Sequence, residues 1–543
     1  MSTPSSRPSS IIIDDANDRA QVAPTSPVAA LIDLSLSPTQ REIAAKNGEH
    51  DLASASKLSM TDSASGERPL PSLHSPLLFR DVSFAVIFLL HITLVLVATS
   101  KIHADGERQE KENDRRNVVS SLHDSPNESF LDQDADVSIA LRSLCVVNML
   151  FSIGWLLLFI YYSKLRFVQG SCIFSVTGFL ALSVMMFLLK SSEGIFWGIA
   201  CAGIVVLQLV WYVRSQHGLD FVAVLYELVV EFLVAHAALG YAVGAALVMY
   251  TIWSSWICTT VGYVGRDVSP WSFCMIYLVF HFYWTSNVVK NIITIVASGT
   301  TIVWYYHDES TEISHKMSEN NVSSGDEATE PNQSKDYFDR KVVLHFARCA
   351  LSSSFGSICI GSLLCPLAHL LWNALRWARR DESILSQRLM SLRSERVENF
   401  IRTYHKYSFV HIAGYNKPFY VAAHDAWNLI EYHGVEAIVD DDLTSRILLL
   451  SGNGWAGAMS ALVASSLSGA SSHVSFFTLV SFTLCYTTMS LAMQVITAVI
   501  KTLFVCFAEN PSRLSQLHPL IYHRFVRLAE LKSFRDYKNR SLA

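Results

Sequence analysis

The apolar run at residues 271–306 carries aromatic and amide side chains that could hold a cation. Tyr277, Trp284, Asn287 and Asn291 recur at helical spacing, which places them on roughly one face of a helix. Aromatic faces attract cations, and a cation without hydrogen-bond donors depends on such faces for binding. Amides at membrane depth need a protein or watery surrounding, because lipid offers them no partner. The spacing predicts that these four residues line a substrate pathway inside a bundle; ordinary helix packing is the competing interpretation.

Other polar residues in or near apolar runs have less specific patterns. Tyr486 and Gln494, in the last run, are secondary pathway candidates with the same packing alternative. Glu227 and Glu231 lie four residues apart, so they share a helical face and could attract a cation or relay protons. An amphipathic helix on the cytoplasmic surface explains the same spacing and is favoured. Lys290 is positively charged and a poor neighbour for a bound cation, so a structural role is predicted.

Catalytic and metal-binding motifs are missing from the sequence. It contains no H-E-x-x-H, G-x-S-x-G or Walker-type string in a suitable context, so we do not expect an enzyme. The ten cysteines include no C-x-x-C pair and lie mostly in apolar runs, which argues against a disulfide framework, a metal site or another cofactor. The net charge of −5 gives no reason to expect a nucleic-acid partner.

The composition is that of a protein embedded in a lipid bilayer. Apolar residues make up 51% of the 543 residues and charged residues only 16%, whereas soluble proteins carry about 25% charged residues. Runs of about 20 apolar residues are long enough to cross the hydrocarbon core. We predict an all-α polytopic bundle of about eight to ten transmembrane helices. The eight clearest runs are residues 82–99, 139–162, 171–189, 194–213, 236–258, 271–306, 447–468 and 474–507.

Three segments leave alternatives open. Residues 271–306 are too many for one straight crossing, so this helix is steeply tilted, extended beyond the membrane or broken near Ser298 and Gly299. Residues 343–375 and 407–430 either both cross the membrane or both are re-entrant or peripheral, because a strongly basic segment separates them. The Gly414–Phe419 string, with Gly, Asn and Pro in six residues, predicts a sharp backbone break or a docked loop.

The predicted organisation has a disordered cytoplasmic tail at residues 1–80, a transmembrane transporter domain at 81–507 and a cytoplasmic C-terminal tail at 508–543. Lys and Arg in the short loops after residues 162 and 213 orient the chain with both termini in the cytoplasm. The domain then has an outer loop at 101–136 and cytoplasmic loops at 307–342 and 376–406. Asn127 begins a glycosylation sequon in the outer loop, where modification is possible.

Five strings, in order along residues 79–525, resemble the choline transporter-like family (solute carrier family 44), particularly its fungal and protist pH-nine-sensitive branch. They are Phe79–Val82, Tyr283–Asn291, Gly356–Leu363, Gly414–Phe419 and Cys506–Pro511. The first outer loop is shorter than that of animal members, and His424 stands where a basic or small residue is expected.

The resemblance implies transport of choline or a related organic cation across the plasma membrane by alternating access. A lipid scramblase or channel-like membrane protein is the alternative, and a receptor or scaffold role is a further one. The implied partners are the small cation and the lipid bilayer, and a homo-oligomer is an open question. Composition alone indicates only a multi-pass membrane protein.

Overall fold

The computed structural model describes nine stretches of the chain and contains only helices in them. The described stretches are residues 79–120, 132–162, 164–216, 219–267, 272–306, 331–380, 395–432, 443–467 and 474–527. Within them there is no β-strand, which confirms the all-α prediction. Residues 1–78 of the predicted N-terminal tail (1–80) and the sequon at Asn127 lie outside the described residues.

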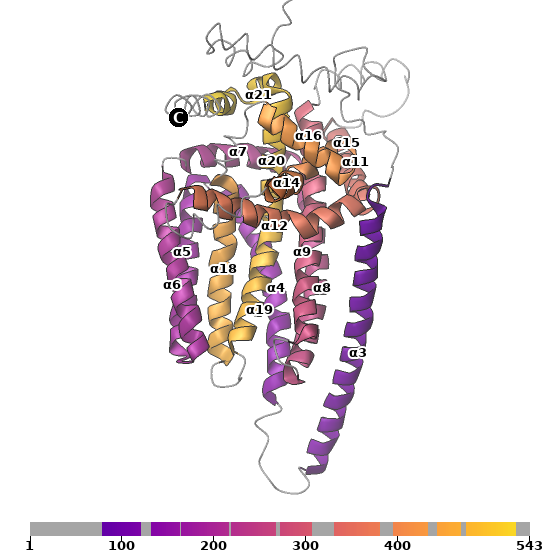
Figure 1. Cartoon of the computed structure of the whole chain (residues 1–543), viewed down its shortest axis with the longest axis vertical. Helices are drawn as coiled ribbons and strands as arrows, with labels where there is room; N and C mark the ends of the chain where they lie inside the picture. The colour runs from indigo at the N-terminus through magenta and orange to yellow at the C-terminus, as the bar shows by residue number, and fades with distance from the viewer. Residues whose placement is uncertain are drawn as a thin grey trace, which may run out of the picture. The chain divides into compact units, whose positions relative to one another are not determined.

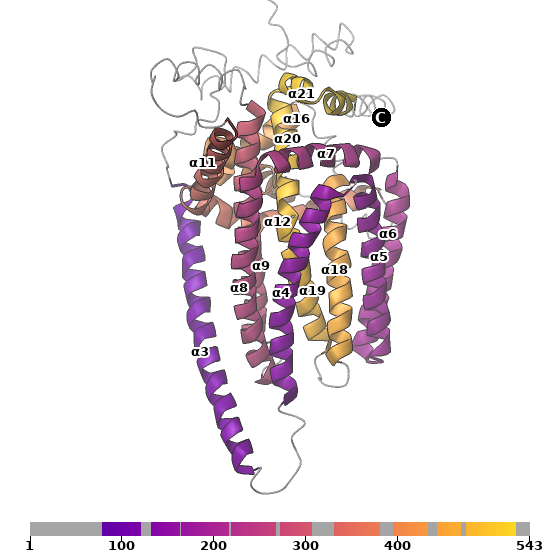
Figure 2. The same ribbon diagram turned by 180° about the vertical axis from the view of Figure 1, so that it is seen from behind.

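Long helices running side by side form the bundle (Figures 1 and 2). They are α3 (Val82–Ser120), α4 (Asp132–Tyr161), α5 (Lys164–Leu188), α6 (Ser192–Ser215), α8 (Ala237–Asp267), α9 (Phe273–Tyr306), α18 (Leu443–Leu467) and α19 (Val474–Ala492). These helices alternate in direction, and α20 (Gln494–Glu509) continues α19 after one residue. The beginning of α3 and the end of α20 therefore lie on the same side of the bundle, here called the terminal side (Figure 1).

Nine helices in the described part of the chain are long and apolar enough to cross a membrane, and α12 (Phe355–Arg380) is one of them. Its direction differs from that of the other eight, because α12 lies across the long helices (Figure 1). The short helix α7 (Leu219–Ala235) also lies across the bundle, on the terminal side (Figures 1 and 2). Length and apolar composition alone therefore do not decide whether a helix runs along the bundle axis.

The two segments that were predicted either to cross the membrane or to be re-entrant or peripheral are each divided into two helices. Residues 343–375 fall in α11 (Pro331–Leu351) and α12, and residues 407–430 fall in α15 (Ser408–Tyr415) and α16 (Phe419–Tyr432). With 8 and 14 residues, α15 and α16 are each too short to cross a bilayer. The remaining short helices are α14 (Glu395–Thr403) and α21 (Pro511–Leu517).

Helix α9 is continuous over all its 34 residues, so the predicted break near Ser298 and Gly299 does not occur. Every residue from Ile293 to Ile302 is buried. This stretch is therefore enclosed by protein, and its length need not match the thickness of a bilayer. Of the alternatives given for residues 271–306, a steep tilt and an extension beyond the membrane stay predictions.

The segment expected as an outer loop, residues 101–136, is largely helical where it is described. Helix α3 continues to Ser120, and α4 begins at Asp132. Glu, Lys, Arg and Gln are good helix formers, so the helix continues after its apolar part ends. Contacts with α8 accompany this extension: Trp256 Nε1 donates to Thr99 Oγ1 at 3.0 Å, and His103 Nε2 lies 2.9 Å from Thr260 Oγ1.

Large apolar side chains on the outer helices are exposed, whereas α9 is largely enclosed. Leu207 on α6 and Leu90 on α3 are exposed by 70% and 65%, and many neighbours on these helices are similar. Isolated exposed apolar residues are ordinary in a soluble protein, but continuous apolar faces of this extent match contact with lipid. The chain is thus a multi-pass membrane protein whose central helix is α9.

Glycines of α5 and α18 bring the backbones of these two long helices close together. A Cβ atom placed on Gly178 would lie 2.1 Å from the backbone oxygen of Gly454. Such contact requires hydrogen at both positions, and small residues drive helix association in membranes because they let backbones come this close.

Replacing Gly178 with alanine should therefore force α5 and α18 apart. We expect a loss of about 1–3 kcal/mol, the usual cost of overpacking, seen as a lower unfolding midpoint of the purified protein in detergent. Gly170→Ala is the matched control on the same helix, since a Cβ there meets no atom within 4 Å. Equal midpoints for both variants would contradict the close packing.

Candidate functional site

A chain of hydrogen bonds joins α3 to the predicted pathway face of α9. The hydroxyl of Tyr277 lies 2.8 Å from His91 Nδ1, and His91 Nε2 lies 3.0 Å from His281 Nδ1. Tyr277 is half-buried and His281 is fully buried. The chain thus runs from a partly accessible phenol into the interior of the protein.

Trp284 is one turn from His281 and is 4% exposed. Its indole Nε1 donates to the carbonyl oxygen of Cys359 in α12 at 3.1 Å, so the ring is fixed in place. Phe88 meets it edge-on with ring centroids 5.0 Å apart, and the His91 ring lies 5.1 Å away. The rings of Trp253 and His281 are 5.3 Å apart. We call this set the aromatic–histidine cluster; its members are Phe88, His91, Trp253, Tyr277, His281 and Trp284.

The cluster offers several aromatic faces and no carboxylate of its own. Tryptophan gives the strongest cation–π attraction among the aromatic side chains, and the attraction grows when the cation is desolvated. Neutral histidines add hydrogen-bonding atoms without a positive charge. The arrangement is suited to a monovalent organic cation that also carries a polar group.

The other nominated residues of α9 do not join this cluster. Asn287 Nδ2 donates to the backbone oxygen of Tyr283 in its own helix at 2.9 Å. Asn291 Nδ2 donates to Ser362 Oγ in α12 at 2.8 Å. The Asn287 amide therefore bonds within its own helix, and the Asn291 amide helps to pack α9 against α12. Of the four α9 residues predicted from the spacing, the structure brings together only Tyr277 and Trp284.

Tyr486 and Gln494 approach a different side of α9. Gln494 Nε2 donates to Thr294 Oγ1 at 2.9 Å. Lys290 Nζ lies 5.7 Å from the centre of the Tyr486 ring, so this aromatic face is already covered by a side chain of the protein itself. The structural role of Lys290 stays a prediction.

The two glutamates on α7 lie on the outside of the bundle. Glu227 is exposed, and Glu231 Oε2 lies 3.6 Å from His518 Nε2. The path of α7 across the bundle on the terminal side matches the favoured interpretation, a surface helix. The cluster is formed by residues of α3, α8 and α9, whereas both glutamates lie on α7, so they stay separate predictions.

Asp81 joins three segments that are far apart in the sequence. Its Oδ2 accepts a hydrogen bond from the Ser357 hydroxyl at 2.5 Å and one from the backbone N–H of Phe419 at 2.9 Å. These contacts fix the beginning of α12 and the beginning of α16, where free backbone N–H groups favour a negative charge. A Cβ on Gly356 would lie 2.1 Å from the Asp81 backbone oxygen, so glycine is required there.

Arg80 strengthens the same junction. Its backbone N–H donates to the carbonyl oxygen of Ser353 at 2.9 Å, and its Nε donates to the carbonyl oxygen of Asn416 at 3.2 Å. Asn416 ends α15 in the left-handed conformation, with φ of 47°. The predicted break in the Gly414–Phe419 string is therefore present, between α15 and α16, and it is held by residues 80 and 81. We call these contacts of Arg80 and Asp81 the Asp81 junction.

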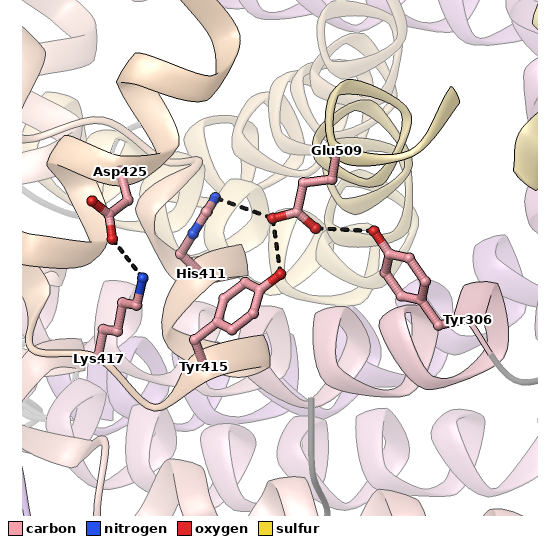
Figure 3. A network of polar contacts seen from close by, with 6 residues as sticks. All are labelled: Tyr306, His411, Tyr415, Lys417, Asp425 and Glu509. Atoms are coloured by element: carbon pink, nitrogen blue, oxygen red, sulfur yellow. Dashed lines mark hydrogen bonds and ion pairs between the residues drawn. The ribbon is translucent and has the colours of Figure 1, made fainter. Parts of the chain in front are cut away.

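A second carboxylate, Glu509, holds another junction on the terminal side (Figure 3). The Tyr306 hydroxyl donates to its Oε2 and the Tyr415 hydroxyl donates to its Oε1, both at 3.0 Å. His411 Nε2 lies 3.9 Å from Oε1, and the Glu509 side chain is only 10% exposed. Helices α9, α15 and α20 meet in this way at one buried acid, and Figure 3 shows the nearby ion pair of Lys417 and Asp425, 2.6 Å apart. We call the contacts of Glu509 the Glu509 network.

The five recognised strings thus meet one another in space. The first, third and fourth meet at the Asp81 junction, the fourth and fifth at the Glu509 network, and the second contacts the third through Trp284 and Asn291. Sequence reasoning gave no role to His91, Asp81 or Glu509. For His91 there was a usable signal, because an ionisable residue within an apolar run is a functional candidate by default.

Burial affects a further histidine on the terminal side. His405 lies between α14 and α15, and its Nε2 is 2.9 Å from the carbonyl oxygen of Ala423 in α16. Desolvation lowers the pKa of His405 to about 4, and the hydrogen bond to Ala423 only partly opposes this. The ring is therefore neutral at pH 7 and donates to that carbonyl. No group of His, Cys, Asp or Glu side chains within the described stretches is arranged to hold a metal ion.

Comparison with known proteins gives one family. The family model described as plasma-membrane choline transporter matches residues 170–512, which include four of the five strings and leave out residues 79–82. Protein pns1 of Aspergillus fumigatus is 24% identical over 269 residues, 47% of this chain and 45% of that protein. A CTL-like protein of Dictyostelium discoideum is 23% identical over 348 residues, 61% of this chain and 56% of that protein.

Protein PNS1 of Saccharomyces cerevisiae is 25% identical over 372 residues, 61% of this chain and 60% of that protein. The alignments thus cover less than two thirds of the length of these relatives. Together the comparisons point to membrane transport.

The Glu509 network can be tested by a double-mutant cycle. Tyr415→Phe removes one donor from a nearly buried carboxylate, so we expect a loss of about 1–3 kcal/mol in the free energy of unfolding. In a Glu509→Gln background the same change should cost less, because the charged acceptor is already gone. Tyr420→Phe, at a tyrosine exposed by 67%, is the control. Equal costs of Tyr415→Phe in both backgrounds would show that the two residues are not coupled.

His405 should make stability depend on pH. Because its folded pKa of about 4 lies below the ordinary value of 6.5, the neutral form favours folding. This contribution is fully present above pH 6.5 and is lost as the pH falls toward 4, by at most about 3 kcal/mol. His405→Gln keeps a donor for Ala423 and cannot take up the proton, so its unfolding midpoint should fall less between pH 7 and pH 4.5. The exposed His424→Gln should behave like the parent.

Proposed function

The chain belongs to the plasma-membrane choline transporter family, and on that premise we propose that it carries choline or a related organic cation across the plasma membrane without a chemical step. The observation that carries this proposal is the family match over residues 170–512, which includes α8, α9 and α12 but leaves out α3. The aromatic–histidine cluster supports it, because a desolvated site rich in aromatic faces suits a cation of this kind.

In this proposal the aromatic–histidine cluster is the binding site and Trp284 is its principal aromatic face. Tyr277, on the same side of α9, lines the approach to it. Four further residues stay predicted to line the pathway: Asn287, Asn291, Tyr486 and Gln494. Helix packing explains the contacts that they make in the structure. The cation is proposed to bind at Trp284, while Lys290 lies over the ring of Tyr486.

Alternating access requires one side of the bundle to close while the other opens. The Asp81 junction and the Glu509 network both hold helices together on the terminal side, at α3, α12 and α16 and at α9, α15 and α20. We propose that these two junctions form the closed gate of that side and that the terminal side is cytoplasmic. Opening to the cytoplasm would then separate the partners of the two carboxylates.

The driving force for uptake need not include a second ion. An inside-negative potential favours cation entry by about 2.3 kcal/mol per elementary charge per 100 mV. That free energy corresponds to roughly 50-fold accumulation of a monovalent cation. A uniporter for a cation therefore concentrates its substrate in any cell with a membrane potential of this size.

The test is uptake of labelled choline into cells without choline carriers of their own, with surface abundance measured for each variant. The parent chain should give saturable uptake. Trp284→Phe keeps an aromatic face and should retain most of it, whereas Trp284→Leu should raise KM by about 2- to 30-fold, the loss of one cation–π contact. Trp197→Leu, at a tryptophan 41% exposed on α6, is the matched control and should match the parent.

Two results would overturn the proposal. No uptake by a parent chain present at the surface would exclude choline carriage, and movement of labelled lipid between leaflets would then identify a scramblase. Equal effects of Trp284→Phe and Trp284→Leu, with normal surface abundance, would show that the aromatic face is not what binds the substrate.

A further inference from the structure

One face of α11 carries exposed cations beside exposed leucines. Lys341, Leu344, Arg348 and Leu351 are three or four residues apart, so they share a face of the helix, and Arg340 lies at its edge, four residues before Leu344. The three basic side chains are exposed, and Leu344 and Leu351 are exposed by 55% and 63%. We call these five residues the basic face of α11.

The opposite face of α11 is packed against the protein. Val342 and Phe346 are buried, and a Cβ placed on Gly299 of α9 would lie 2.3 Å from the Phe346 ring. Asp339 is also buried, with its Oδ1 3.7 Å from Nε2 of His236, just before the beginning of α8. These contacts hold α11 in place, so its basic face points away from α9.

The charge of the basic face is not neutralised by the described part of the chain. The side chains of Arg340, Lys341 and Arg348 make no hydrogen bond or ion pair there. Between residues 339 and 351 the only acid is the buried Asp339. Three neighbouring cations repel one another and favour an anionic partner, and the two exposed leucines favour a partner that also has an apolar part.

The end of α11 lies at the height at which α3 begins its apolar run. Ser353, two residues after α11, accepts a hydrogen bond from the backbone N–H of Arg80 at 2.9 Å, and α3 is apolar and long enough to cross a bilayer from Val82 onward. Leu351 therefore lies at the edge of the hydrocarbon. Lys341 is about 15 Å from Leu351 along the helix, a span that the headgroup layer and a Debye length of about 8 Å cover together.

We infer that the basic face of α11 docks onto the headgroups of anionic phospholipids in the leaflet on the terminal side. Such a lipid supplies the negative charge and the apolar chains that the cations and leucines require. Anionic lipids are concentrated in the cytoplasmic leaflet, which agrees with the side proposed for the gate. The competing occupant is the segment 307–330 of the chain, which has seven Asp or Glu and one Lys.

The experiment reconstitutes the full-length protein in vesicles of phosphatidylcholine and phosphatidylserine at about four to one. The protein is extracted in a neutral detergent, and the lipids that stay bound are quantified by mass spectrometry. Each Lys or Arg near an anionic surface strengthens binding by about five-fold. The parent should therefore retain phosphatidylserine with an enrichment of about five-fold or more over the vesicle ratio, and high salt should lower it.

The double variant Lys341→Gln/Arg348→Gln should lose most of this enrichment. Lys341→Arg/Arg348→Lys keeps both charges and should keep it. The matched control is Arg166→Gln/Arg214→Gln, which removes two exposed cations near the beginning of α5 and the end of α6, also on the terminal side. This control should retain the parent's enrichment, and all three variants should have the parent's unfolding midpoint in phosphatidylcholine alone.

Three results would overturn the inference. A parent without enrichment would show that the segment 307–330 or water covers the basic face, and this result needs no variant to fold. Unchanged enrichment in Lys341→Gln/Arg348→Gln would place the bound lipid elsewhere. Equal losses in that variant and in the control would show a diffuse attraction by surface charge without a docking face on α11.

Discussion

The carboxylate of Asp81 fixes the arrangement on which the rest of the candidate site depends. By accepting hydrogen bonds from Ser357 and from the backbone of Phe419, it sets where α12 begins and how α16 follows α15. Helix α12 then passes over α9, where its backbone oxygen at Cys359 receives the indole N–H of Trp284. The orientation of the Trp284 ring therefore depends on the Asp81 junction, which lies just before the first residue of α3.

Helix α9 has two different sets of neighbours. On one side lie the rings around His91, His281 and Trp284, and on another Lys290 Nζ lies 5.7 Å from the centre of the Tyr486 ring. Burial of an ammonium group is costly unless nearby groups stabilise it. In the proposed function, the cationic ligand therefore lies on the side of the aromatic rings.

The long helices could be predicted from the sequence because bilayer thickness imposes a minimum apolar length on them. That rule fails where protein, and not lipid, surrounds a helix. It could not place α12, which is apolar enough to span yet lies across the bundle, or explain the length of α9, whose residues 293–302 are enclosed. At the site, helical spacing placed Tyr277 and Trp284 on one face of α9, and the structure brings both to His91. The spacing could not show that Asn291 bonds to Ser362, because that contact joins residues 71 positions apart.

Helix α3 continues without a break well beyond its apolar part, so its far end lies a long way from Asp81. At 1.5 Å per residue, its 39 residues measure about 58 Å. It is joined to α8 through Thr99 and His103, and Asp81, just before its first residue, accepts from Ser357. A tilt of about 10° about Asp81 carries the far end of α3 through about 10 Å, given its length. A rearrangement at the Asp81 end would thereby be magnified at Ser120, where a spectroscopic distance label would record it with the greatest sensitivity.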